Sequence, residues 1–343
     1  MTRANVDRAV GLLALVLAVL APFFVSSYWV GTLLTQMLFL GVVAASLIFL
    51  SSYGGMVSLA QVAIFGIAGF VVGNATTNGN TKGLNLNWNP WWGVLLGLAF
   101  AVGVGLLFGA LASRSVGIYF LMITLTYSVI ANLTFGQVTD VSGFGGISGI
   151  PAPHFIGAVN AHQNRLYYVT LVVAFAVYLL LRYVARTPFG LTLQGVRDDP
   201  VRMASLGYNV PLHRTLAFTF TAFIAGIGGV LFVWWNGHID PASIDLGTTI
   251  DVLVIAVVGG LYRLEGAWVG ALFFVIVNNY SQQISWIGPR FHTLIGAIFL
   301  VIVLVSPGGL IGLWDRLLNL LFARRRGPSD RTPLDIGRAE PST

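Results

Sequence analysis

The sequence predicts an all-α, polytopic membrane protein, a bundle of about ten transmembrane helices of which at least one is broken or re-entrant. Of its 343 residues, 56% are hydrophobic and only 9% are charged, whereas soluble domains carry about 25% charged residues. Apolar runs of about 17–25 residues recur along the chain, the length that crosses a hydrocarbon core about 30 Å thick. Because these runs are continuous rather than alternating, they disfavour a transmembrane β-barrel.

The apolar runs place the spans in order along the chain. We expect them at residues 10–27, 31–50, 56–74, 92–112, 116–137, 166–185, 214–236, 248–262, 266–284 and 291–306. The first run follows Arg3 and Arg8 as a secretory signal would, but it lacks a small-residue cleavage motif, so we expect an uncleaved span. Residues 1–323 then form the membrane domain, and the polar segment 324–343 is expected to be a disordered tail.

Two of these spans are irregular. The third carries an unusual number of glycine and polar residues, and the eighth is short, with Asp245 and Asp251 at its expected outer end. Discontinuous helices occur in membranes where they line a cavity, because lipid cannot satisfy free backbone groups. Close helix packing through small residues explains the same pattern equally well.

The distribution of arginine predicts the orientation. With ten spans and the N-terminus inside, Arg114, the segment 182–214, Arg263 and the cluster 324–326 all fall on one side of the membrane. The positive-inside rule assigns that side to the cytoplasm, together with both termini. The net charge of +6 therefore reports topology, and no nucleic-acid partner is expected.

The sequence gives little support for an enzyme or a cofactor site. The only lysine, Lys82, lies in a predicted outer loop and not in a P-loop motif, so the chain does not hydrolyse ATP by itself. There is no cysteine, and the five histidines lack ligand spacing, so no metal site is expected. Asp251 is the one acidic side chain available as a membrane-depth relay, so uphill transport would draw its energy from another subunit.

A polar segment at residues 186–213 interrupts the apolar runs and is expected to face water. Asp199 followed by Pro200 predicts a helix N-cap and first helical residue, and Gly207 is placed to end the helix. Asp198 and Asp199 favour the helix start electrostatically. Val201, Ala204 and Leu206 give this short helix an apolar stripe. A helix this short is marginal alone in water, so we expect it to dock on a partner; an ordinary solvated loop is the alternative.

This segment resembles the coupling loop of ABC importer permeases, and most closely that of the branched-chain amino acid permeases. The resemblance rests on Arg186-Thr-Pro-Phe-Gly and on Gly195-Val-Arg-Asp-Asp-Pro, with Leu191 and Pro200 departing from the common pattern. Gly54-Gly-Met-Val-Ser-Leu-Ala-Gln, Gly259-Gly-Leu-Tyr-Arg-Leu-Glu-Gly and Ser306-Pro-Gly-Gly-Leu-Ile-Gly are similar to further motifs of that family, in the family's order. Chain length, the extra first span and the basic tail resemble its LivM-type subunits.

The resemblance implies a heteromeric importer in a bacterial plasma membrane. Its other members would be a second, LivH-type permease, two ATPase subunits and an extracytoplasmic solute-binding protein. ATP and Mg²⁺ would bind to the ATPases, leaving this chain without a cofactor, and transport would follow alternating access. The segment expected to contact the ATPases contains Arg197, Asp198, Asp199, Pro200, Ala204 and Gly207.

The solute path is predicted to pass Ser58, Gln61 and Phe65, because small polar and aromatic groups can contact an amino acid in passing. Asp251 would attract an ammonium group at the outer vestibule. Helix packing, and for Asp251 helix capping, are the alternative interpretations.

Other functions remain open at this stage. The family resemblance favours branched-chain or related amino acids, but relatives also carry urea, short amides or other small metabolites. Outside this class, the chain would be an ion-coupled secondary carrier that uses Asp251, or a membrane scaffold that docks a soluble protein.

Overall fold

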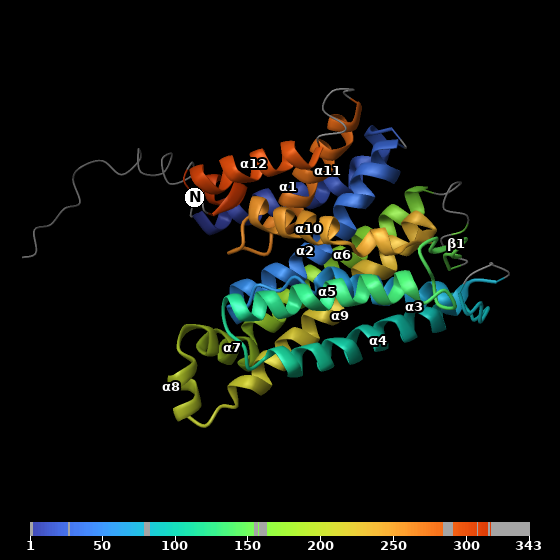
Figure 1. Cartoon of the computed structure of the whole chain (residues 1–343). Coiled ribbons are helices and arrows are strands. Elements are labelled where there is room, and N and C mark those ends of the chain that lie inside the picture. Colours follow the sequence, from blue (N-terminus) through green and yellow to red (C-terminus); the bar gives the residue numbers. More distant parts are fainter. Residues whose placement is uncertain are drawn as a thin grey trace, which may run out of the picture.

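The computed structural model describes residues 3–26, 28–78, 83–153, 157, 163–283, 291–306, 308–314 and 316. These residues fold into a bundle of helices with a two-stranded sheet at one end (Figure 1). The elements are α1 (Arg3–Phe24), η1 (Trp29–Leu34), α2 (Thr35–Gly54), α3 (Gln61–Thr76), α4 (Pro90–Ala112), α5 (Ile118–Gln137), β1 (Ile147–Ser148), α6 (Gln163–Arg186), α7 (Pro188–Asp198), α8 (Pro200–Ser205), α9 (Val210–Asn236), β2 (His238–Ile239), η2 (Pro241–Ile244), α10 (Leu246–Gly259), α11 (Gly266–Gln283) and α12 (Phe291–Val305). The expected all-α membrane bundle is confirmed.

The centre of the bundle consists of α2, α3 and α9, which are buried along most of their length. Glycine allows the closest of these contacts. A Cβ atom at Gly229 of α9 would overlap the backbone of Phe65 in α3, so these two helices meet backbone to backbone, as small residues permit in membranes. Some of the chain's 41 glycines therefore serve close helix packing here.

Helix α4 buries its small residues and exposes its large apolar ones, as a helix that faces lipid does. Its buried positions are all small residues: Gly93, Gly97, Ala101, Gly105 and Gly109, spaced four apart, and Ala112. Its large apolar side chains, such as Leu95, Phe100, Leu107 and Leu111, are exposed instead. Small residues allow close approach to α3 and α9, and large ones face the surroundings.

The two ends of the bundle differ in character. Helices α7 and α8 project from one end, and the antiparallel pair β1–β2, joined through Ile147 and Ile239, lies at the other (Figure 1). Helix α1 begins, and α12 ends, at the same end as α7 and α8 (Figure 1). The segment before α4 and the first turn of that helix carry the exposed indoles Trp88, Trp91 and Trp92, as is typical of residues at a membrane–water interface.

The span boundaries predicted from hydropathy agree with the helices to within a few residues, with two exceptions. The first helix begins at Arg3, seven residues before the expected start of its span. The third span, expected from residue 56, starts as a helix only at Gln61, because Gly55 adopts a left-handed conformation (φ 66°) that ends α2, and residues 55–60 are non-helical. Helix α10 has only 14 residues, or about 21 Å of rise. Both irregular spans are therefore real features of the backbone.

The described residues include five helices long and apolar enough to cross a membrane and five shorter apolar ones, at the positions of the ten expected spans. The number of spans and the side of each terminus stay predictions. Lys82, the cluster 324–326 and the expected tail 324–343 lie outside the described residues.

Candidate functional site

Helix α8 forms as its sequence predicts. The side chain of Asp199 accepts a hydrogen bond from the backbone N–H of Arg202 at 2.9 Å, and Pro200 occupies the first helical turn. At the other end Gly207 has φ 90°, a conformation in which a Cβ is unfavourable. Asp199 and Gly207 therefore fix the beginning and the end of this single short helix.

Within the described chain nothing buries the apolar stripe of Val201, Ala204 and Leu206, whereas Met203 of α8 lies against Gly195 of α7. Val201 is 75% exposed and Leu206 is 67% exposed, Ala204 is also exposed, and no residue of α8 is buried. A six-residue helix cannot be stable in water through its own hydrogen bonds. Its shape therefore comes from its two caps and from the helix that precedes it.

That preceding helix, α7, is absent from our sequence-based expectations, which treat residues 186–198 as loop. The side chain of Thr187 caps its first turn, and Pro188 follows as the first helical residue, a Thr-Pro signal that could have located it. Leu193 and Val196 are fully buried, where α7 packs against α2, α6 and α9. Helix α7 is thus the firm base from which α8 projects.

Arg197 connects this base to the break in the third span. Its guanidinium pairs with Asp198 (Nη2–Oδ1 2.7 Å) and donates a short hydrogen bond to the carbonyl oxygen of Ser52, at the end of α2. Its aliphatic stem lies against Gly55, where a Cβ would overlap the Arg197 side chain. The coupling segment therefore touches the backbone at the point where α2 gives way to the non-helical residues 55–60.

One expectation for this segment needs correction. Asp198 was expected to favour the start of α8, but it is the last residue of α7, and its carboxylate is occupied by Arg197. The structure brings Arg197, Asp198, Asp199 and Pro200 together at the junction of α7 and α8, with Ala204 further along α8 and Gly207 just beyond its end. Contact of these residues with an ATPase stays a prediction.

The predicted path residues Ser58, Gln61 and Phe65 lie together at the break and at the start of α3. All three are buried in this conformation. The amide of Gln61 contacts the hydroxyls of Ser46 in α2 (3.2 Å) and Thr221 in α9 (3.3 Å). Ser46 precedes the end of α2 by about two turns, or about 12 Å, so this polar cluster lies inside the bundle. Its role in transport stays a prediction.

A polar stripe on α5, missed by the sequence analysis, faces the same region. The backbone N–H of Leu59, in the break, donates to Thr124 Oγ1 (3.1 Å), and Ser128 bonds to Thr249 of α10 (3.0 Å). Asn132 donates to the carbonyl of Pro241 (2.7 Å). The spacing of four residues places all three polar groups on one helix face. Thr124 satisfies a backbone N–H in the break, Ser128 binds a side-chain hydroxyl of α10, and Asn132 binds a carbonyl of η2 just before α10.

Asp251 stands apart from the other predicted path residues, on α10. The helix cap is formed by Asp245, whose Oδ1 accepts from the N–H of Thr248 at 2.7 Å, and Asp251 lies in the second turn, partly exposed. Capping by Asp251 is therefore excluded as its role. Attraction of an ammonium group stays a prediction.

Comparison with known proteins identifies relatives of this chain. The profile of a family described as "Branched-chain amino acid transport system / permease component" matches residues 29–304. The high-affinity branched-chain amino acid transport system permease protein LivM of Escherichia coli is 24% identical over 342 residues, covering 91% of this chain and 77% of the relative.

Two further relatives extend the comparison. LivM of Salmonella typhimurium is 24% identical over 257 residues, which are 68% of this chain and 60% of that protein. The permease protein LivH of Escherichia coli is 26% identical over 161 residues, 46% of this chain and 50% of the relative. No solved structure matches the chain.

Proposed function

The chain belongs to the branched-chain amino acid ABC transporter permeases, as a LivM-type member, and we propose that it is the membrane-spanning permease subunit of an ATP-driven importer. Its solute is a branched-chain or related amino acid, carried by alternating access. The chain itself hydrolyses nothing. It converts closure of separate ATPase subunits into opening and closing of a path through the bundle.

The observation that carries this proposal is the exposed helix α8 on its rigid base α7. Exposed apolar side chains on a capped, projecting helix suit insertion into a cleft of a partner, because docking would bury Val201 and Leu206 at about 25 cal/mol per Å². In a loop that stays in water, these apolar side chains would remain exposed without any compensating contact. The segment 186–213 is therefore the ATPase-coupling element of this permease.

The route from α8 to the solute path is short. Movement of α8 acts on α7, and Arg197 of α7 holds the Ser52 carbonyl and lies against Gly55. The non-helical residues 55–60 that follow lie between α2 and α3 and lead to Gln61. We infer that residues 55–60 exchange between two backbone conformations, and that closure of the ATPases shifts the equilibrium between them. Switching it would open the buried cluster of Ser58, Gln61 and Phe65.

The assembly follows from the same reasoning. The partners are a LivH-type permease, two ATPase subunits and an extracytoplasmic binding protein, in a bacterial inner membrane. Relatives of both LivM and LivH type match this chain, which supports a permease pair. The cytoplasmic face is the end that carries α7 and α8, so ten spans would put both termini there as well.

Reconstitution tests the proposal. The purified permease pair is placed in liposomes with and without the ATPases, and uptake of radiolabelled leucine, urea and acetamide is measured with binding protein outside. Uptake of leucine that requires both ATP and the ATPases is the expected result. Uptake by the permeases alone, driven by a proton or sodium gradient, would establish an ion-coupled carrier instead. ATP-dependent uptake of urea or acetamide but not leucine would change the solute and leave the importer class intact.

A further inference from the structure

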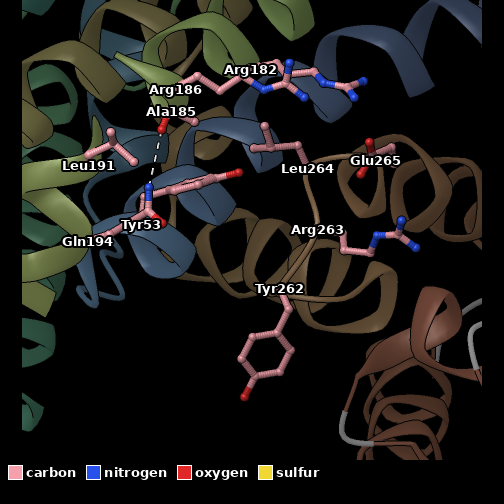
Figure 2. Close-up of a pocket in the computed structure, with 10 residues that line it drawn as sticks. All are labelled: Tyr53, Arg182, Ala185, Arg186, Leu191, Gln194, Tyr262, Arg263, Leu264 and Glu265. Carbon is pink, nitrogen blue, oxygen red and sulfur yellow. Dashed lines mark hydrogen bonds between the residues drawn. The ribbon is translucent and has the colours of Figure 1, made fainter. Parts of the chain in front are cut away.

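A basic cavity of about 550 Å³ opens at the end of the bundle that carries α7 and α8. Its lining comes from four separate parts of the chain: the end of α2, the last turns of α6, helix α7 and the loop between α10 and α11 (Figure 2). Arg186, Leu191 and Gln194 of its lining belong to the coupling segment, but the lining includes neither the residues from Arg197 to Gly207 nor the predicted path residues. The cavity therefore needs an explanation of its own.

The lining carries an excess of positive charge. It contains three arginines, Arg182, Arg186 and Arg263, and a single carboxylate, Glu265. That carboxylate already accepts a hydrogen bond from the Tyr178 hydroxyl (2.8 Å), to which Arg182 donates in turn (2.9 Å). Among the described residues no hydrogen-bond or ion-pair partner of the Arg186 guanidinium is found. The lining thus holds more guanidinium groups than carboxylates, and the Arg186 guanidinium is open to a ligand.

The remaining walls are apolar or aromatic. Ala185, Leu191 and Leu264 line the cavity, and the Tyr53 ring points into it, whereas Tyr262 points away (Figure 2). The amide of Gln194 donates to the Ala185 carbonyl (3.3 Å), which holds α7 against α6 on this side. An anionic head with an apolar continuation fits such a lining better than a small inorganic ion.

The cavity lies at the depth of a lipid headgroup. The apolar span Asn164–Arg186 ends at Arg186, so Arg182 and Arg186 occupy its last two turns, at the membrane–water interface. On α6 the neighbouring side chains Leu179 and Tyr183 are exposed, as expected for residues that contact lipid and its headgroup region. Basic pockets between transmembrane helices on the cytoplasmic side bind anionic headgroups.

We propose that this cavity binds the phosphate of an anionic phospholipid, with Arg186 and Arg263 as the principal ligands and Arg182 beside them. Arginine suits a phosphate because its planar guanidinium donates two parallel hydrogen bonds. The bound headgroup would join α6 and the α10–α11 loop to α7, the base of the coupling helix. The lipid then stiffens the part of the permease through which ATPase movement passes. The shared chemistry is a phosphate ester, which a soluble metabolite also offers.

The test uses the purified full-length chain in a neutral detergent, with thermal unfolding followed by tryptophan fluorescence. It is titrated with dioctanoyl phosphatidylglycerol, dioctanoyl phosphatidylcholine and sn-glycerol 3-phosphate. A saturable rise in Tm with phosphatidylglycerol alone is expected. In Arg186→Gln and Arg263→Gln the midpoint should shift to about tenfold higher lipid, which corresponds to about 1.4 kcal/mol.

The matched control is Arg114→Gln, which removes an exposed arginine between α4 and α5, outside the cavity. It should titrate as the unmodified chain does. Equal stabilisation by the two lipids, or an unchanged midpoint in both cavity variants, would overturn the proposal. Full stabilisation by sn-glycerol 3-phosphate would assign the cavity to a soluble phosphate ester and exclude the lipid. If a cavity variant misfolds, native mass spectrometry counts the phosphatidylglycerol retained by the unmodified chain and by the control. Retained lipid on both supports the proposal, and its absence from both overturns it.

Discussion

At the residue scale, the arrangement around α8 depends on single side chains whose roles are separable. Asp199 caps the helix, Gly207 ends it in a left-handed conformation, and Arg197 fixes its base to Ser52. Because each acts through a different contact, substitutions can distinguish the shape of the coupling helix from its attachment. The first two were predictable from local sequence, and the third required the fold.

Replacing the cap tests whether the shape of α8 matters for coupling. Asp199→Lys removes the acceptor of the Arg202 N–H and places a positive charge at the helix N-terminus, at a cost of about 1 kcal/mol to a helix of six residues. We expect uptake to fall several-fold while ATP hydrolysis continues. Asp199→Asn, which keeps a capping oxygen, should retain most of the uptake. Equal uptake by the two variants would mean that the cap has no role in coupling.

Asp251 distinguishes an ATP-driven importer from an ion-coupled carrier. It is partly exposed in the second turn of α10, and Asp245 rather than Asp251 caps that helix. Asp251→Asn removes the charge and keeps the size, so we expect uptake to change by less than about threefold, since energy comes from ATP. The measurement is leucine uptake in the reconstituted system at several pH values. Complete loss of uptake would instead support a charge-relay role.

At the element scale, the structure separates a rigid base from a projecting helix. Helix α7 buries Leu193 and Val196, whereas α8 buries none of its residues. The consequence is that α8 can be altered without disturbing the bundle. Its apolar face is the part of the segment that only a partner would bury.

The double variant Val201→Ser, Leu206→Ser uses this separation. Both side chains are exposed, so the substitutions should leave the thermal stability of the isolated chain unchanged. Loss of a buried apolar contact with the ATPase would lower its affinity by about tenfold or more, since each such side chain contributes about 1.5–3 kcal/mol when buried. Co-purification of ATPase with the permease measures the effect. Leu179→Ser, at an exposed position on α6, is the control and should retain the ATPase.

The two irregular spans are also stabilised by contacts between elements. Residues 55–60 and the short helix α10 are held by side chains of α5, through Thr124 and Ser128. Glycine content and short apolar length indicated irregularity in both spans. They did not indicate which helix would supply the missing hydrogen-bond partners, because those partners are distant in sequence.

At the scale of the whole molecule, the bundle has a polar, projecting end and an opposite end with a small sheet (Figure 1). Arginine distribution predicts that the projecting end faces the cytoplasm. This orientation underlies both the coupling proposal and the lipid site.

The absence of cysteine from the chain allows a direct test of the orientation. Single variants Ser205→Cys, in α8, and Ser148→Cys, in β1, place thiols at exposed positions at the two ends. In intact right-side-out cells a membrane-impermeant maleimide should label position 148 only, and position 205 should react after permeabilisation. The reverse pattern would refute the orientation, and with it the cytoplasmic coupling role of α8.

Composition and local pattern were sufficient for the fold class, for the approximate position of the helices and for the cap and end of α8. These features depend on hydropathy and on contacts between residues close in sequence, and both can be read from the local sequence. It did not reveal helix α7 as a separate element, although Thr187-Pro188 was a usable signal, because the surrounding charges resemble a loop.

Only the tertiary structure decided what these elements do to one another. It brought Arg197 to Ser52 and Gly55, placed Gln61 between Ser46 and Thr221, and assembled the basic cavity from α2, α6, α7 and the α10–α11 loop. Each of these contacts joins residues separated by many positions along the chain. Their geometry depends on how whole helices pack, which backbone-to-backbone contacts at glycines such as Gly229 fix, and no local pattern encodes it.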